Sequence, residues 1–92
     1  MSHKPSIVRA RYILTLLRVA RSGEDHEAIR LVTALSSEYR LPNTPADLVP
    51  FEHATIEAVE KLAAGLASTD KNHSVLWERA AAAATEWLNA AD

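Results

Sequence analysis

Hydrophobic residues recur every three or four positions in four separate segments of the 92-residue chain. An α-helix advances about 100° per residue, so this spacing gathers the hydrophobic side chains on one face of a helix. β-branched residues never form a run of the kind that favours strands. The pattern therefore predicts no strand and four amphipathic helices, at about residues 5–21, 25–39, 50–67 and 73–90.

The residues at the predicted helix ends agree with these boundaries. Pro5 suits a first helical turn, because the N–H that proline lacks has no helical partner there. Glu24, Asp25 and Glu27 surround the start of the second helix, where the helix dipole favours negative charge. We expect Gly23 to end the first helix in a left-handed conformation, which glycine adopts at little cost.

One irregular link, residues 41–49, contains Pro42 and Pro45. Thr44 followed by Pro45 and an acidic Asp47 is typical of a helix start, so we expect a single short helical turn there. The other connections are short, which favours antiparallel packing of successive helices. The sequence thus predicts an all-α fold, a compact antiparallel four-helix bundle, with the 92 residues in a single domain.

The stripe of the last predicted helix is rich in alanine, so a neighbouring helix must approach it closely. We expect Trp77 and Trp87 to fill the two ends of that seam. Leu35 and Leu62 lie in the middle of their stripes and are predicted to be core residues. Gly65, at the edge of the third stripe, indicates either a close helix crossing or early fraying of the helix.

The composition removes several kinds of chemistry. The chain has no Cys, which excludes disulfides, thiol catalysis and cysteine-ligated metals. It has no Gly-rich phosphate loop and no Gly-x-Ser-x-Gly motif. His26 and His73 are expected at one end of the bundle and His3 and His53 at the other, but no di-iron or zinc-protease motif accompanies them. We therefore expect no enzymatic activity, no cofactor and no metal site.

The charges are distributed unevenly along the chain. Residues 1–22 carry five basic side chains and no acid, although the net charge of the whole chain is −2. Three interpretations remain open for this basic helix. It is a solvated face partly neutralised by the second and third helices, a surface for an anionic partner, or a mitochondrial presequence.

Several large apolar residues fall outside the main stripes. Val8, Tyr12 and Val19 lie on a second side of the first helix, Ile29 lies off the stripe of the second, and Trp77 lies on a shoulder of the fourth. Either they merge into an exposed patch, or some are buried because the bundle is wider than the stripes indicate. Aromatic and arginine side chains are common anchors of protein interfaces. The predicted partner-binding residues are Arg11, Tyr12, Arg18, Val19 and Trp77.

These features favour a small non-enzymatic protein that binds another protein. It would be an adaptor, an inhibitor, an immunity-type or phage accessory protein, or a self-associating homodimer. The alternative is a nucleic-acid-associated regulator whose first helix contacts phosphates. High Ala and Arg usage favours a bacterial or phage source, and the lack of a long apolar stretch favours the cytoplasm over a membrane.

Overall fold

The structure is a computed structural model that describes residues 4–37, 44–68 and 73–92. No strand occurs in these three ranges. Seven of the eight predicted helix ends fall within them, and each of the seven is correct to one residue. The eighth is the C-terminal end of the second helix. That helix is predicted to end at residue 39 and is described only as far as Ser37. The four helices are α1 (Lys4–Ser22), α2 (Asp25–Ser37), α3 (Val49–Ala67) and α4 (Ser74–Ala91).

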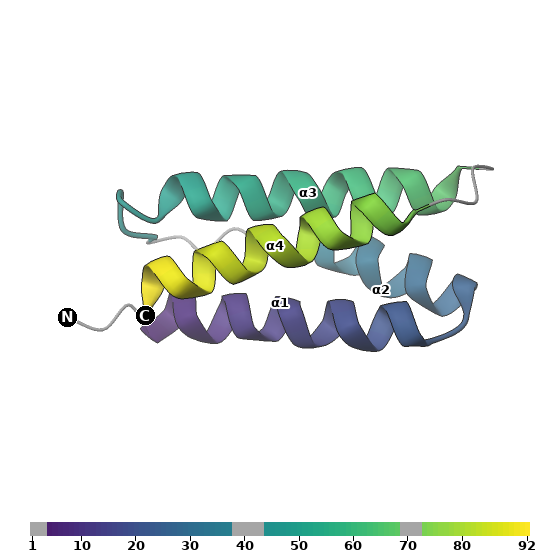
Figure 1. Ribbon diagram of the computed structural model, residues 1–92, viewed down its shortest axis with the longest axis horizontal. Helices are drawn as coiled ribbons and strands as arrows, with labels where there is room; N and C mark the ends of the chain where they lie inside the picture. Colours follow the sequence, from purple (N-terminus) through teal and green to yellow (C-terminus); the bar gives the residue numbers. More distant parts are fainter. Residues whose placement is uncertain (1–3, 38–43, 69–72) are drawn as a thin grey trace.

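The helices form an antiparallel bundle in which each helix packs against two neighbours. α1 contacts α2 and α4, and α3 also contacts α2 and α4, so α1 and α3 lie on one diagonal of the bundle. α2 is the shortest helix and lies along one end of the longer ones (Figure 1). The predicted fold class and the antiparallel order are confirmed.

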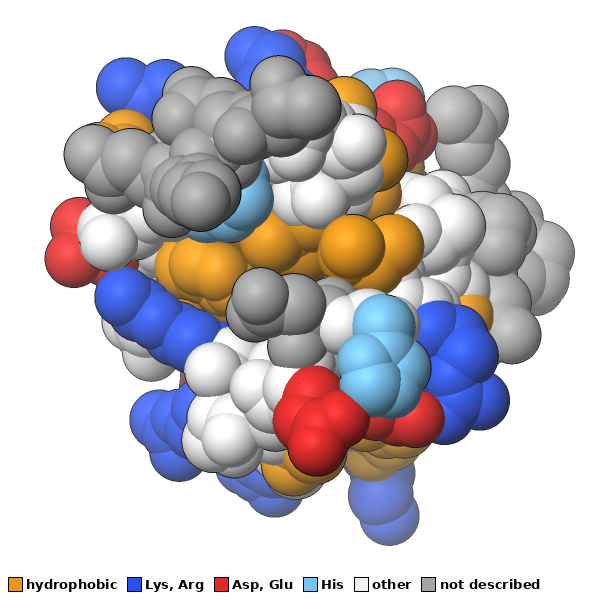
Figure 2. Space-filling view, turned by 90° about the vertical axis from the view of Figure 1, so that its right-hand side faces the viewer, with side chains coloured by type: hydrophobic (Ala, Val, Ile, Leu, Met, Phe, Trp, Pro, Cys, Tyr) orange, Lys and Arg blue, Asp and Glu red, His pale blue; other side chains and the backbone are white. Residues whose placement is uncertain are grey.

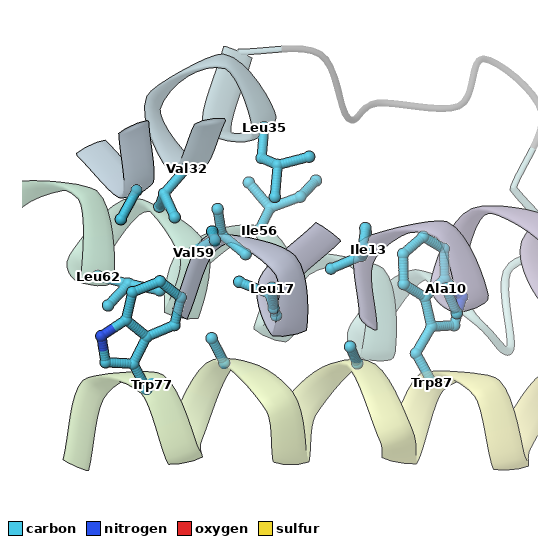
Figure 3. Packing of buried hydrophobic residues seen from close by; sticks show 14 residues of the cluster. Ala10, Ile13, Leu17, Val32, Leu35, Ile56, Val59, Leu62, Trp77 and Trp87 are labelled. Atoms are coloured by element: carbon cyan, nitrogen blue, oxygen red, sulfur yellow. The ribbon is translucent and has the colours of Figure 1, made fainter. Parts of the chain in front are cut away.

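All four helices contribute to a single apolar core. Leu35 and Leu62 are buried in it, as their positions in the stripes predict. Trp77 and Trp87 extend from the two ends of α4 into this core, with short alanine side chains between them (Figure 3). Because alanines such as Ala80 add little volume, the neighbouring helices approach α4 closely along this stretch.

Gly65 marks one of these close approaches, between α3 and α4. A Cβ atom at this position would overlap the end of the Leu76 side chain on α4. The prediction of a helix crossing at Gly65 is therefore confirmed, and α3 continues two residues beyond it to Ala67.

The end of α1 differs from the prediction. No glycine in the described residues has a positive φ, so the expected left-handed conformation of Gly23 is wrong. The N–H of Gly23 instead donates to the carbonyl of Ala20, three residues earlier, at 3.3 Å. This tightened last turn leads into α2 at Asp25 without a left-handed residue.

The described part of the link forms one turn that runs into α3. The N–H groups of Leu48 and Val49 both donate to the carbonyl of Pro45, at 2.9 and 3.2 Å. This agrees with the single helical turn predicted around Pro45. Residues 41–43 of the predicted link lie outside the described residues.

Candidate protein-interaction surface

α1 has two faces of different character. Ile13 and Leu17 on its inner face are buried in the core. On the opposite side Val8, Tyr12 and Val19 are exposed, with 59, 45 and 53% of their surface accessible. Their spacing of four and seven residues aligns them along the outer side of the helix, and we call these three residues the outer stripe.

Single exposed apolar side chains are normal, but the outer stripe is continuous along three turns. Thr15 lies between Tyr12 and Val19, and its hydroxyl donates to the carbonyl of Arg11 at 3.0 Å. The helix itself therefore satisfies the polar group of Thr15. Seen from the end of the bundle, hydrophobic and basic side chains lie next to each other along the lower margin, on the side of α1 (Figure 2).

Four exposed basic residues of α1 accompany the outer stripe. Lys4, Arg11, Arg18 and Arg21 are exposed, and no described carboxylate lies within 4.0 Å of any of them. The ion pairs Arg30–Glu27 and Lys61–Glu57 lie on α2 and α3. α3 packs against α2 and α4 and not directly against α1. For these four side chains, neutralisation by the second and third helices is therefore not supported by contacts.

A small hollow lies between α1 and α4. Its volume is about 140 Å³, and Arg18 and Arg21 line it from α1 while Trp77 and Ala81 line it from α4. We call it the α1–α4 hollow. The structure thus brings together Arg18 and Trp77, two of the predicted partner-binding residues.

Of the two alternatives for Trp77, burial is the one found: only 8% of its surface is accessible, and it packs in the core at one end of α4 as expected. The alanines of α4 let α1 approach so closely that the shoulder carrying Trp77 is covered. Ile29, the other side chain predicted off its stripe, is half-buried. The sequence left open whether the apolar side chains outside the main stripes are exposed or are covered by a wider bundle. Trp77 and Ile29 are covered, wholly or in part, whereas the outer stripe is exposed.

A second, larger hollow adjoins the outer stripe near the start of α1. It measures about 570 Å³, and the described residues that line it are Lys4, Pro5, Val8, Arg9 and Tyr12. The described residues that line it all belong to α1.

Sequence analysis did not predict a buried polar group at the start of α3. Glu52 is only 4% exposed, and its carboxylate accepts a hydrogen bond from the Thr44 hydroxyl. A signal was present, because Glu52 lies four and seven residues before the buried Ile56 and Val59. Glu52 is enclosed in the bundle and offers no surface to a partner.

The histidines form no recognisable metal centre in the described residues. No three His, Asp or Glu side chains gather there in a way that would hold an ion. His26 is exposed and lies 3.6 Å from the carboxylate of Glu24. His3, one of the predicted pair at the other end, lies outside the described residues.

Two further findings bear on function. No helix in the described ranges is long and apolar enough to cross a membrane. Comparison of the chain with protein-family models, with curated proteins and with solved structures finds no match.

Proposed function

We propose that this protein is a non-enzymatic protein-interaction module whose contact surface is the outer face of α1. The observation that supports this is the outer stripe, three large apolar side chains aligned on the solvent side of a helix whose inner side already packs in the core. Aligned exposed apolar side chains are typical of binding surfaces. Tyr12 next to arginines has the composition of an interface hot spot.

The outer stripe alone is too small to hold a partner. Its three side chains are already about half covered, so burying the rest of each contributes about 1 kcal/mol, or roughly 3 kcal/mol in total. Association costs at least about 4 kcal/mol in lost freedom of motion. The interface must therefore extend to the flanking arginines.

The alternative is a nucleic-acid-associated regulator, and the observation that favours it is the lack of acids on α1. The four exposed cations of this helix have no described acidic partner within 4.0 Å. Phosphates would contact Arg11 and Arg18, and binding would weaken steeply with salt through counterion release. Against this function, the outer stripe occupies the outward face of the same helix, and its apolar side chains offer nothing to a phosphate backbone.

The test is capture of partners from the native host by the tagged protein and its variants. Tyr12→Ala and Val19→Ala are expected to reduce capture. Val75→Ala is the matched control, because Val75 on α4 is as exposed as Val19 but lies on another helix. Capture that is unchanged by both α1 variants contradicts the proposal, and a mobility shift of duplex DNA that disappears at moderate salt supports the alternative.

A further inference from the structure

We propose that the α1–α4 hollow binds a small organic acid, whose carboxylate lies between Arg18 and Arg21 and whose apolar body packs on the wall formed by α4. This site is separate from the surface proposed above for a protein partner, so the inference goes beyond that function. It follows from three features of the described residues: the two arginines, the apolar wall and the size of the hollow.

Two arginines supply the positive charge of the hollow. Arg18 and Arg21 are about one helical turn apart on α1, both are exposed, and both line the hollow. Neither lies within 4.0 Å of a described carboxylate, and none of the described residues that line the hollow is acidic. A carboxylate that binds here accepts charge-assisted hydrogen bonds from the guanidinium groups, and such bonds are about twice as strong as neutral ones.

The rest of the wall is largely apolar. Leu14 and Leu17 line the hollow from α1, and Trp77 and Ala81 line it from α4. Thr85 is the polar residue on this side, but its hydroxyl donates to the carbonyl of Ala81 at 2.8 Å, so the helix itself satisfies that donor. A hydrocarbon group that packs on this wall removes apolar surface from water, which favours binding. The wall therefore selects a ligand that carries an apolar body beside its carboxylate.

The size of the hollow limits the ligand further. Its volume is about 140 Å³, whereas drug-sized ligands occupy pockets of about 300–1,000 Å³. A single aromatic ring or a short branched chain suits this space, and a nucleotide or a segment of protein backbone does not. The ligand class is therefore a monocarboxylic acid with one small apolar group.

The hollow lies on a different flank of α1 from the outer stripe. An α-helix turns about 100° per residue, so Leu14 lies about 200° round the helix from Tyr12, and Arg21 lies about 200° round from Val19. A protein seated on the outer stripe therefore leaves Arg21 and the apolar wall of the hollow open. The two sites can be tested separately, and the failure of one does not imply the failure of the other.

The experiment titrates the full chain with three small molecules at constant ionic strength and follows the amide signals by NMR. Benzoate carries both the carboxylate and an apolar ring, benzamide carries the ring without the charge, and acetate carries the charge without the ring. We expect saturable shifts with benzoate, centred on the residues that line the hollow. Benzamide and acetate are each expected to bind about tenfold more weakly, because each lacks one of the two interactions.

Variants then locate the ligand. Arg21→Gln is expected to weaken benzoate binding about tenfold, because a charged hydrogen-bond donor is lost. The matched control is Arg79→Gln, which removes the same charge from the α3-facing side of α4 and is expected to leave the affinity unchanged. Ala81→Leu keeps both arginines but fills the apolar part of the hollow, so it is expected to abolish the shifts. Circular dichroism checks that each variant is folded, and the comparison of the three molecules on the unaltered chain stands without the variants.

Each contrary result has a distinct meaning. Equal affinity for benzoate and benzamide overturns the role of the arginines, and equal affinity for benzoate and acetate overturns the role of the apolar wall. Shifts centred elsewhere, or no shift at the hollow with millimolar benzoate, overturn the site itself. Benzoate binding lost in Arg21→Gln while partner capture is unchanged supports two separate sites, whereas loss of both in this variant overturns their separation.

Discussion

The two longest helices, α1 and α3, lie on one diagonal of the bundle and differ on their outward faces. α1 exposes Val8, Tyr12 and Val19, whereas α3 exposes no large hydrophobic side chain. On α3 Lys61 pairs with Glu57 at 3.0 Å, while the exposed cations of α1 have no such partner in the described residues. Both helices bury an inner face in the core, so the difference lies on their outward faces, and the proposed binding role of α1 rests on this difference.

The largest expected effect tests whether the inner faces of α1 and α3 contribute equally to the free energy of unfolding. Ile13→Ala on α1 and Leu62→Ala on α3 each remove a fully buried side chain. Each variant is expected to lower the free energy of unfolding by about 2–5 kcal/mol, through lost burial and the cavity that remains. Urea denaturation measures this. Lys61→Ala, on the exposed side of α3, is the control and is expected to cost less than about 0.5 kcal/mol.

The next effect tests whether the outer faces of α1 and α3 differ in their contribution to binding. Tyr12→Ala is expected to cost about 2 kcal/mol of binding free energy, because aromatic anchors carry much of an interface's energy. Calorimetric titration with the partner captured from the native host gives the value. Glu60→Ala on the outer side of α3 should leave the affinity unchanged. If the two variants weaken binding equally, the contrast between the helices has no functional meaning.

A smaller effect separates binding from folding on α1 itself. Val19→Gln is expected to change the free energy of unfolding by less than about 0.5 kcal/mol, because 53% of Val19 is exposed. The same denaturation experiment measures it. A loss comparable to that of Ile13→Ala would mean that Val19 packs in the folded chain and that the outer stripe is not a free surface.

The smallest effect concerns an exposed ion pair on α2. On α2 the guanidinium of Arg30 donates to Glu27 at 2.6 Å and lowers the pKa of that carboxyl below its ordinary value of 4.5. The pair therefore favours the folded chain above pH 4.5, and this contribution disappears as pH falls through the lowered pKa. NMR titration of Glu27 should show the low midpoint, and Arg30→Gln should return it toward 4.5. Because both side chains are exposed, the effect on stability is small.

The sequence predicted the helices and the core because both follow from periodicity. Leu35 and Leu62 are buried for the reason that their spacing indicates, and Tyr12 is exposed because it lies opposite the main stripe. Whether Trp77 is exposed or buried was left open, because periodicity gives the direction of a side chain but not the depth of its burial. That depth depends on how closely α1 approaches α4, which is a property of the packed bundle.

The α1–α4 hollow could not be predicted for a related reason. Arg18 was chosen from the outer charge of α1, but its position beside Trp77 depends on the relative placement of two helices far apart in the chain. The burial of Glu52 was not predicted, because hydrophobic periodicity places apolar residues in the core and gives no reason for an acid in the same stripe to be buried. Its spacing from Ile56 and Val59 is the local signal that a search for buried acids would use.

The short length of α2 has a consequence for motion in the native state. α2 has 13 residues, against 18 or 19 in the other helices, and it is held mainly by Val32 and Leu35. α1, α3 and α4 remain in contact with one another through α4 when α2 detaches. Opening of α2 alone therefore costs less free energy than global unfolding. Its amide hydrogens should exchange with deuterated solvent before those in the middle of α3 and α4, so that α2 forms a separate, less protected unit of the bundle.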